Sequence, residues 1–300
     1  MLRHHGTDPL MKLLVVGHQG QLGKDMMLAA SASGFAAQGV DFPAIDITSE
    51  TGVADAVGRY KPDVIINCAA YTAVDKCETE EAAAFSVNAG GVKNLALAAR
   101  RCGAKLVHIS TDYVFDGTNK SPYIESDTPN PLSVYGKSKL AGEKQLLETC
   151  DRYFIFRIAW LYGTKGNNFL KTILGLARKR AGTGEPLKVV SDQLGTPTYT
   201  VHVCNQILSM VSGERFGLYH CTNEGQCSWF DFACAIVLAY GIPVDVVPCT
   251  TAEFPRPAPR PANSVLENEQ LKKLGINIMP RWEKGLEEYI EEEKKLKVGS

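Results

Sequence analysis

Short apolar runs alternate with longer amphipathic stretches along the first half of the chain. Such runs predict strands buried on both faces, and they occupy residues 12–16, 35–40, 62–69, 105–110 and 153–159. Stretches with helical periodicity lie between them, one ending at Ala32 and the others spanning residues 51–59, 80–101 and about 134–149. Strands separated by helices of this length predict an α/β fold with a doubly wound parallel sheet. Ligands of such a sheet bind at the carboxyl ends of its strands.

The alternation loosens after Trp160, where a Gly- and Asn-rich stretch (163–168) and a Pro-rich stretch (254–261) appear. We interpret residues 11–160 as a dinucleotide-binding domain and residues 161–300 mainly as a smaller substrate-binding domain that closes over it. Residues 218–221 and 229–240 are expected to return the chain to the sheet, so that parts near 200–222 belong to the first domain. Residues 282–297 predict a charged helix with a solvated face.

Composition excludes several classes of function. The apolar share is 45% and the charged share 22%, as in an ordinary globular protein. A net charge of -1 provides no long-range attraction for nucleic acid or an anionic membrane. No apolar run reaches the length of a membrane span. We therefore expect no nucleic-acid partner and no membrane partner.

The N-terminal residues and the cysteine pattern indicate the cellular compartment. Residues 1–10 are polar and unlike a signal peptide, and we interpret them as a leader whose His4 and His5 are tag remnants rather than ligands. The nine cysteines are odd in number and contain no C-x-x-C pair. This pattern indicates neither a disulfide framework nor a zinc site, and it favours a reducing cytoplasm.

A glycine-rich turn follows the first predicted strand and opens a helix. Gly17, Gly20 and Gly23 form a G-x-x-G-x-x-G pattern. The tight turn, the approach of the backbone to a pyrophosphate and the packing of the helix on the sheet each require a residue without Cβ. The helix N-terminus favours the phosphate charge. The position of this turn at the first strand-to-helix junction predicts a Rossmann-type dinucleotide site.

Asp41 bears on which dinucleotide is used. It ends the second predicted strand, 18 residues after Gly23. A carboxylate there accepts hydrogen bonds from ribose hydroxyls and repels a 2′-phosphate, which favours NADH. Lys24, just after the glycine loop, could tolerate that phosphate. Both NADH and NADPH therefore stay open, with NADH slightly favoured.

A phenol and an amine occupy one face of the helix predicted at residues 134–149. Tyr135 and Lys139 are at i and i+4, whereas Lys137 at i+2 points elsewhere. A phenol with a pKa near 10 is a poor acid or base at neutral pH, and a nearby ammonium lowers that pKa. Thr111 lies at the end of a predicted strand, where its hydroxyl can hold the substrate oxygen that Tyr135 protonates. The order of glycine loop, Thr111 and Tyr–Lys pair predicts a proton-transfer site.

Asn88 falls inside a predicted helix, where asparagine is a poor residue. Two interpretations stay open for it. It either kinks the helix through a local backbone bond, or it marks a distortion whose free carbonyl holds water linking Lys139 to solvent.

At this point the residues resemble a known group, the extended short-chain dehydrogenases, and within it the dTDP-4-dehydrorhamnose reductase family. The resemblance runs from Met11 to about Tyr289. The matching stretches are GHQGQLG, RYKPDVIINCAAYTAVDKCE, HISTDYVFDG, PLSVYGKSKLAGEK, FRIAWLYGTKGNNF, VVSDQLGTPT and RPANSVL.

The resemblance implies a role for each matching residue. The catalytic residues would be Thr111, Tyr135 and Lys139. Besides the glycine loop and the Tyr–Lys pair, the cofactor would be lined by Gln21, Leu22, Asp41, Asp46, Ile47, Ala70, Tyr71 and Thr72. The sugar nucleotide would meet Thr111, Asp112, Trp160, Asn168 and Arg260, with the loop 192–198 nearby.

The resemblance also implies the reaction, which is reduction of the C4 keto group of a dTDP-4-dehydro sugar for polysaccharide precursors. A 4,6-dehydratase is disfavoured because Asp112 is followed by Tyr113, not by the second carboxylate of those relatives. A 4-epimerase and a non-catalytic regulatory subunit of methionine adenosyltransferase type remain alternatives. The regulatory alternative ranks last because Tyr135 and Lys139 are both present.

Metal and assembly are the last expectations. Some members of this family use carboxylates to hold magnesium between subunits, but one of those positions is Val201 here. We therefore expect no metal, and either a monomer or a homodimer.

Overall fold

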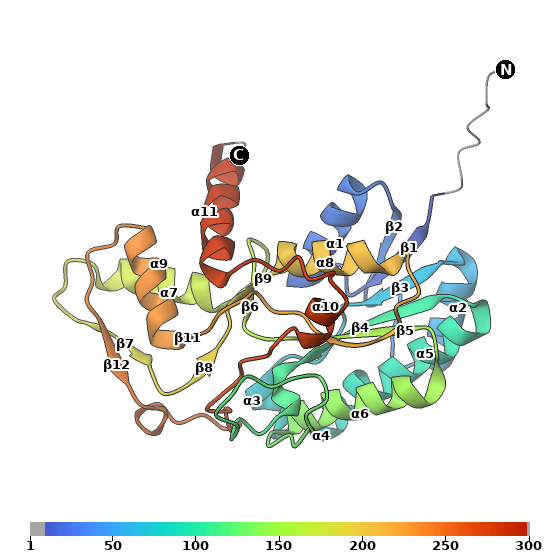
Figure 1. Cartoon of the computed structure of the whole chain (residues 1–300), viewed down its shortest axis with the longest axis horizontal. Coiled ribbons are helices and arrows are strands. Elements are labelled where there is room, and N and C mark those ends of the chain that lie inside the picture. Colours follow the sequence, from blue (N-terminus) through green and yellow to red (C-terminus); the bar gives the residue numbers. More distant parts are fainter. Residues whose placement is uncertain (1–9, 299–300) are drawn as a thin grey trace.

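A six-stranded parallel sheet forms the centre of the computed structural model, which describes residues 10–298 (Figure 1). The strand order is β10-β5-β4-β3-β1-β2, and every neighbouring pair is parallel. The strands are β1 (Lys12–Val16), β2 (Ala36–Val40), β3 (Val64–Asn67), β4 (Lys105–Thr111), β5 (Tyr153–Ile158) and β10 (Gly217–His220). The five apolar runs of the first half therefore form strands, as predicted, and the doubly wound α/β fold is confirmed.

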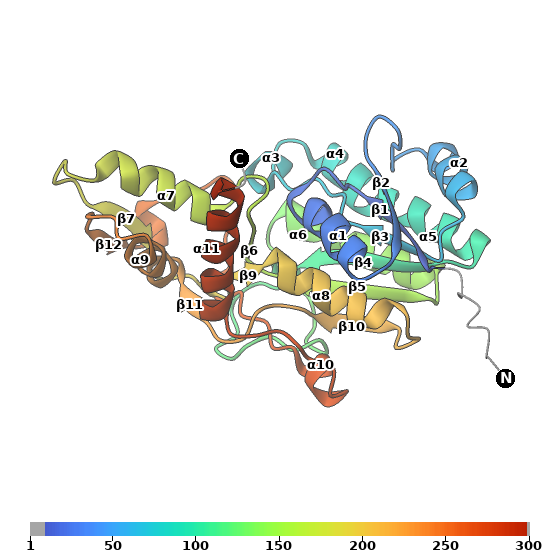
Figure 2. The same ribbon diagram turned by 90° about the horizontal axis from the view of Figure 1, so that it is seen from above.

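Helices cover both faces of the sheet. One face carries α1 (Gln21–Ala32) and α8 (Thr200–Val211), and the other carries α2 (Glu50–Tyr60), α5 (Gly91–Cys102) and α6 (Val134–Thr149) (Figures 1 and 2). Side chains that alternate along each strand enter the two cores in turn. On β1, Leu13 and Val15 pack with the first pair of helices, whereas Leu14 and Val16 pack with the second group.

The helix predicted at residues 80–101 is not one regular helix. It consists of α4 (Glu81–Phe85), a π-helical segment (Ser86–Gly90) and α5. The Asn88 side chain holds the loop after β3, because the Tyr71 N–H donates to its Oδ1 (2.8 Å) and its Nδ2 donates to the Tyr71 carbonyl (3.1 Å). Of the two interpretations of Asn88, the local backbone bond is wrong, because its side chain binds Tyr71, and a distortion is present. The role of its carbonyl toward water stays a prediction.

The rest of the chain forms a smaller lobe beside the sheet (Figure 2). Its core packs around α7 (Phe169–Arg180), α9 (Trp229–Ala239), α11 (Trp282–Val298) and the parallel pair β7 (Leu187–Val190) and β12 (Val246–Cys249). The expectation that residues 229–240 return to the sheet is wrong, because α9 packs on α7, β7 and β12. The tail helix is confirmed.

Short elements connect these bodies. They are α3 (Val74–Cys77), α10 (Glu269–Lys273), β6 (Leu161–Tyr162), β8 (Leu194–Gly195), β9 (Thr198–Tyr199), β11 (Cys227–Ser228) and the 3-10 turns Asp112–Val114 and Thr251–Glu253. No helix within residues 10–298 is long and apolar enough to cross a membrane. All nine cysteines are free thiols. The interpretation of residues 1–10 as a leader, with His4 and His5, lies almost wholly outside the described residues.

The contact between α6 and the π-helical segment gives a test of the packing. A Cβ added to Gly142 would lie 2.1 Å from the Asn88 carbonyl oxygen. We expect Gly142→Ala to lower the free energy of unfolding by about 2 kcal/mol, because the two segments must separate. Gly58→Ala, on the exposed side of α2 with nothing within 4 Å, should raise it by about 0.5–1 kcal/mol. Urea unfolding of both variants checks this, and a neutral Gly142→Ala would contradict it.

Candidate active site

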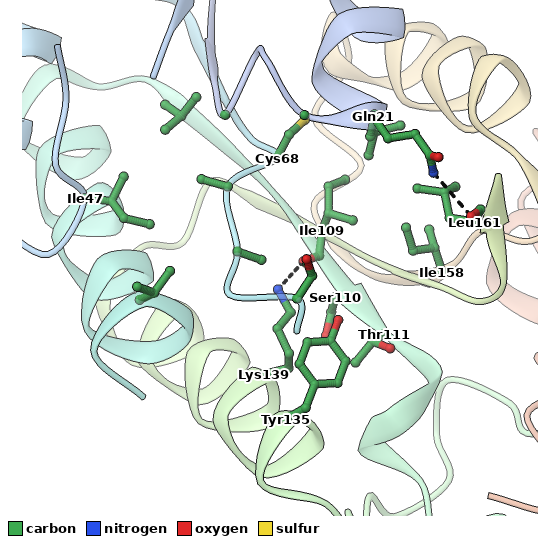
Figure 3. Close-up of a pocket in the computed structure, with 18 of the residues that line it drawn as sticks. Gln21, Ile47, Cys68, Ile109, Ser110, Thr111, Tyr135, Lys139, Ile158 and Leu161 are labelled. Carbon is green, nitrogen blue, oxygen red and sulfur yellow. Dashed lines mark hydrogen bonds between the residues drawn. The ribbon is translucent and has the colours of Figure 1, made fainter. Parts of the chain in front are cut away.

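A cavity of about 760 Å³ opens at the carboxyl ends of the parallel strands (Figure 3). Its walls come from the loops that follow five of the six strands, including Gly17 after β1, Asp41 after β2 and Ala69 after β3. The ends of β4 and β5 contribute Thr111 and Trp160. This is the edge where a doubly wound fold binds its ligands.

The glycine loop has the close approaches that its sequence predicts. Gly17 has a φ of +78°, and a Cβ there would lie 2.6 Å from the Ala69 nitrogen. A Cβ on Gly23 would lie 2.2 Å from the Gly17 oxygen, so this glycine lets α1 pack under the turn. Gly20 precedes α1 and makes no side-chain cap. The first N–H groups of α1 therefore face the cavity without a side-chain acceptor, which suits a phosphate.

Asp41 is fixed at the rim of the cavity by backbone donors. Its Oδ2 accepts the Gln19 N–H (3.0 Å) and its Oδ1 accepts the Phe42 N–H (2.9 Å). The Asp41 Oδ2 also lies 4.0 Å from His18 Nδ1. Asp46 lines the cavity further along and binds Thr48, whose hydrogen bonds lower the pKa of its carboxyl. The rim is thus acidic at the position that the sequence assigns to a ribose.

Tyr135, Lys139 and Thr111 line this cavity together (Figure 3). The Ser133 hydroxyl caps α6 by accepting the Gly136 N–H (3.1 Å), so that Tyr135 and Lys139 stand on its first two turns. The Lys139 ammonium donates to the Ile109 carbonyl (2.6 Å), and burial lowers its pKa to about 8. Lys137 is exposed, as predicted.

The Tyr135 phenol lies beside Thr111 and Asp112. Burial raises its pKa, the nearby Asp112 raises it further, and a hydrogen bond with Thr111 opposes both effects. The phenol is therefore protonated at neutral pH. The expectation that the ammonium of Lys139 lowers this pKa is wrong, because burial dominates and raises it. The Thr111 hydroxyl donates to Asp112 Oδ1 (2.8 Å), and burial raises the pKa of the Asp112 carboxyl to about 6.

A second cavity of about 480 Å³ adjoins the first. Tyr113 and Trp160 line both cavities and form the wall that they share. Lys188, Arg256 and Arg260 bring positive charge to the second cavity. Its apolar lining includes the side chains of Phe169, Ile173, Leu176, Leu187, Val189, Val190, Trp229, Phe254 and Pro261. Apolar walls with a few cations suit a nucleotide base joined to phosphates.

Trp160 is held in an unusual conformation. Its φ is +48°, a left-handed backbone that costs a residue with a Cβ about 1–3 kcal/mol. Trp229 stacks on its ring with centroids 3.4 Å apart, and a Cβ on Gly195 would lie 2.2 Å from the ring. Packing on both sides therefore fixes the indole between the two cavities.

Comparison with known proteins agrees with this geometry. The family model described as RmlD substrate binding domain matches residues 11–295. A dTDP-4-dehydrorhamnose reductase of Burkholderia thailandensis is 42% identical over 91% of this chain and 95% of its own length. The chain belongs to the dTDP-4-dehydrorhamnose reductase family.

Solved structures of that family superimpose closely. The crystal structure of a dTDP-4-dehydrorhamnose reductase from Clostridium acetobutylicum has a TM-score of 0.91 at 46% identity, covering 95% of this chain and 100% of that chain. The Bacillus anthracis dTDP-4-dehydrorhamnose reductase, solved in complex with NADP, has a TM-score of 0.91 at 40% identity, with the same coverage. The resemblance inferred from the sequence is thus confirmed, and membership of this reductase family makes the chain an oxidoreductase.

Two residues that the family resemblance assigned to the ligands, Asn168 and Tyr71, line neither cavity. Asn168 lines neither cavity, whereas its neighbour Asn167 lines the first. The Asn168 Oδ1 caps α7 by accepting the Lys171 N–H (3.1 Å). The Asn168 Nδ2 donates to Gln21 Oε1 (2.9 Å). Tyr71 also lies outside the lining, since its hydroxyl binds Glu80, although Ala70 and Thr72 line the first cavity.

Two further family-implied positions can be placed. Gly23 supports the turn from below rather than lining it. Arg260 lines the second cavity and pairs with Asp75 on α3 (2.9 Å).

Several lining residues had not been singled out in the sequence. They are Phe42, Ile45, Thr48, Cys68, Ala69, Val74, Val87, Ile109, Ile158 and Leu161. Cys68 and Ala69 directly follow β3, so their position at a strand end was a usable signal. Within residues 10–298, no group of three or more His, Cys, Asp or Glu side chains could hold a metal ion.

Asp112 allows a test by stability. A folded-state pKa of about 6, above the ordinary 3.8, gives stability that is present below pH 4 and is lost as pH rises through 6. We expect the unfolding free energy of Asp112→Asn, relative to the unchanged chain, to rise by about 2 kcal/mol from pH 4 to pH 7.

The matched control is Asp116→Asn. Hydrogen bonds from Thr118 and Asn130 hold the pKa of the Asp116 carboxyl below its usual range, so this variant should show no such change above pH 4. Urea unfolding at several pH values measures both differences. A flat difference for Asp112→Asn would contradict the assigned burial effect.

Proposed function

We propose that this chain reduces the C4 keto group of dTDP-4-dehydro-L-rhamnose with NADH or NADPH, giving dTDP-L-rhamnose for polysaccharide precursors. The observation that carries the proposal is the convergence of Tyr135, Lys139 and Thr111 in one cavity beside the glycine loop. The enzyme would act in the cytoplasm, where its free thiols stay reduced. It would act as a monomer or a homodimer.

The residues of the first cavity fit a nicotinamide dinucleotide. Gly17 and Gly20 line the cavity without a Cβ, so the backbone can approach a pyrophosphate at the start of α1, while Gly23 lets the helix pack under the turn. Gly20, Gln21 and Leu22 would hold the phosphates, and Asp41 the adenosine ribose. The dinucleotide, when bound, supplies the hydride that reduces the carbonyl carbon.

Side chains of the protein would supply the proton of the new hydroxyl group. The Tyr135 phenol would hydrogen-bond the keto oxygen and give it the proton of the new hydroxyl group. The Thr111 hydroxyl, which donates to Asp112, would turn to hold the same oxygen. Lys139 would hold the nicotinamide ribose and, in its charged form, stabilise the phenolate that remains on Tyr135.

The second cavity would hold the nucleotide of the substrate. Arg260 and Arg256 would face the diphosphate, and the apolar walls would hold the base. Trp160, shared by both cavities, would contact the sugar between them. We thus assign residues 11–160 with 200–222 to the cofactor and most of the remaining residues 161–300 to the substrate.

Product analysis tests the proposed reaction. The enzyme would be incubated with the dTDP-4-keto sugar and either reduced cofactor, and the sugar identified by NMR. We expect cofactor oxidation in step with formation of dTDP-L-rhamnose. Formation of the other C4 configuration, or interconversion of sugars without net cofactor oxidation, would contradict the proposal.

Tyr135→Phe tests the proton donor. We expect kcat to fall about 1000-fold because the hydroxyl that gives the proton is lost. The cofactor dissociation constant, measured by fluorescence titration, should stay within about twofold because only one oxygen is removed. Tyr60→Phe is the control, since its hydroxyl donates to the Ala36 carbonyl (3.0 Å) outside the cavity. Near-normal turnover of Tyr135→Phe would rule out the assignment.

Asp41→Asn tests the cofactor preference. We expect the ratio of kcat/KM for NADPH to that for NADH to rise about tenfold, because a charge that repels the 2′-phosphate is removed. Asp46→Asn removes the other rim carboxylate and should change the ratio much less. Steady-state kinetics with both cofactors decides this. An unchanged ratio in Asp41→Asn would place the determinant elsewhere.

A further inference from the structure

A buried chain of polar side chains runs from β3 to the amine of Lys139. Asn67 Nδ2 lies 3.2 Å from His108 Nδ1, and His108 Nε2 lies 3.4 Å from Lys139 Nζ. Asn67, His108 and Lys139 are 1%, 0% and 2% exposed, so the contacts between them are buried. Asn67 Oδ1 accepts the Ala69 N–H (3.1 Å) from the loop after β3. The function proposed above uses Lys139 but neither of the other two side chains.

The positions of the protons in this chain follow from donor and acceptor counting. The Ala69 N–H can only donate, so the Asn67 oxygen must face it and the Asn67 NH₂ must face His108. An NH₂ group can only donate, so His108 Nδ1 must accept with its lone pair. Burial lowers the pKa of His108 well below its usual value, so the ring is neutral and carries one proton. That proton is therefore on Nε2.

The Nε2–H of His108 points at Lys139. An ammonium group offers only N–H donors, so two donors would face each other across 3.4 Å. A neutral amine has a lone pair that accepts the Nε2–H. The Ile109 carbonyl accepts from Lys139 in either state, and this hydrogen bond is stronger with the ammonium.

We propose that His108 is a positioning residue for Lys139: its Nε2–H, fixed by Asn67, favours the neutral amine. Since it concerns how Lys139 works, this inference rests on the proposed function. Its consequence is that Lys139 gains and loses a proton near neutral pH instead of remaining a permanent cation. The proton that Tyr135 gives to each new hydroxyl group can then be replaced from solvent through an amine that readily exchanges protons.

The other groups around Lys139 favour its charged form. Glu143, one turn further on α6, and Cys68, after β3, both raise its pKa. Glu143 is itself paired with Arg157 on β5 (2.7 Å), which reduces its effect. Tyr135, one turn earlier, is a neutral phenol. His108 is thus the polar neighbour that acts together with burial against the ammonium.

The tautomer can be measured directly in the unmodified protein. Of the described histidines, His108 and His220 are fully buried, with the pKa of His220 lowered to about 3. His220 Nδ1 lies 3.1 Å from both the Tyr123 and Glu267 carbonyls, so its proton must be on Nδ1. In ¹⁵N-histidine spectra we expect the His108 and His220 rings not to titrate between pH 6 and 9 and to be opposite tautomers. Two Nδ1–H rings, or a titrating His108, would overturn the inference whatever the activity.

A second experiment reverses the tautomer. Asn67→Asp supplies two acceptor oxygens. One still accepts the Ala69 N–H, and the other accepts a proton on His108 Nδ1. His108 Nε2 then presents its lone pair to Lys139. We expect the basic limb of the kcat/KM pH profile to move up by about one pH unit.

A matched background separates the tautomer from the added charge. His108→Phe removes the imidazole, so Asn67→Asp in that background can act only through its charge and should move the limb less. Equal shifts in both backgrounds would show that His108 has no part in the effect. Cofactor affinity of each variant verifies that the cleft is folded.

Discussion

The attachment of α6 to the ends of β4 and β5 fixes where the reacting groups stand. Glu143 on α6 binds Arg157 on β5 through two hydrogen bonds of 2.9 and 2.7 Å and also accepts the Ser110 hydroxyl. Lys139, one turn earlier, is tied to the Ile109 carbonyl. Removing one partner of such a buried pair costs about 3–5 kcal/mol, so this junction resists displacement. The phenol of Tyr135 is thereby held opposite the hydroxyl at the end of β4.

The two halves of the cleft are built differently, and the difference matches their proposed ligands. The cofactor side consists of backbone, of glycines that admit close approach and of a carboxylate at the rim. The substrate side consists of aromatic and cationic side chains carried by the smaller lobe. Trp160 belongs to both sides, and its left-handed backbone is compensated by the stack with Trp229. A sugar nucleotide bound across this wall would place its sugar beside Tyr135.

Much of this could be predicted from the sequence because it depends on local pattern. Strands β1 to β5, helix α6 and the spacing of Tyr135 and Lys139 follow from periodicity within short windows. The sequence indicated a distortion at Asn88 but not its π-helical form, because that form reflects the approach of Asn88 to Gly142 across two helices. The second cavity joins segments distant in the sequence, and the Asn168 amide donates to Gln21, 147 residues away in the chain. Long-range packing decided each of these features.

The central claim is that Tyr135 and Thr111 hold the oxygen at C4 of the sugar beside the nicotinamide. A crystal structure of the enzyme with oxidised cofactor and dTDP-L-rhamnose tests it most directly. The account predicts the C4 oxygen within hydrogen-bond distance, about 2.6–3.2 Å, of both side-chain oxygens. It also predicts the nucleotide in the cavity lined by Arg260 and Trp229. A C4 oxygen facing away from both side chains in that complex would contradict it.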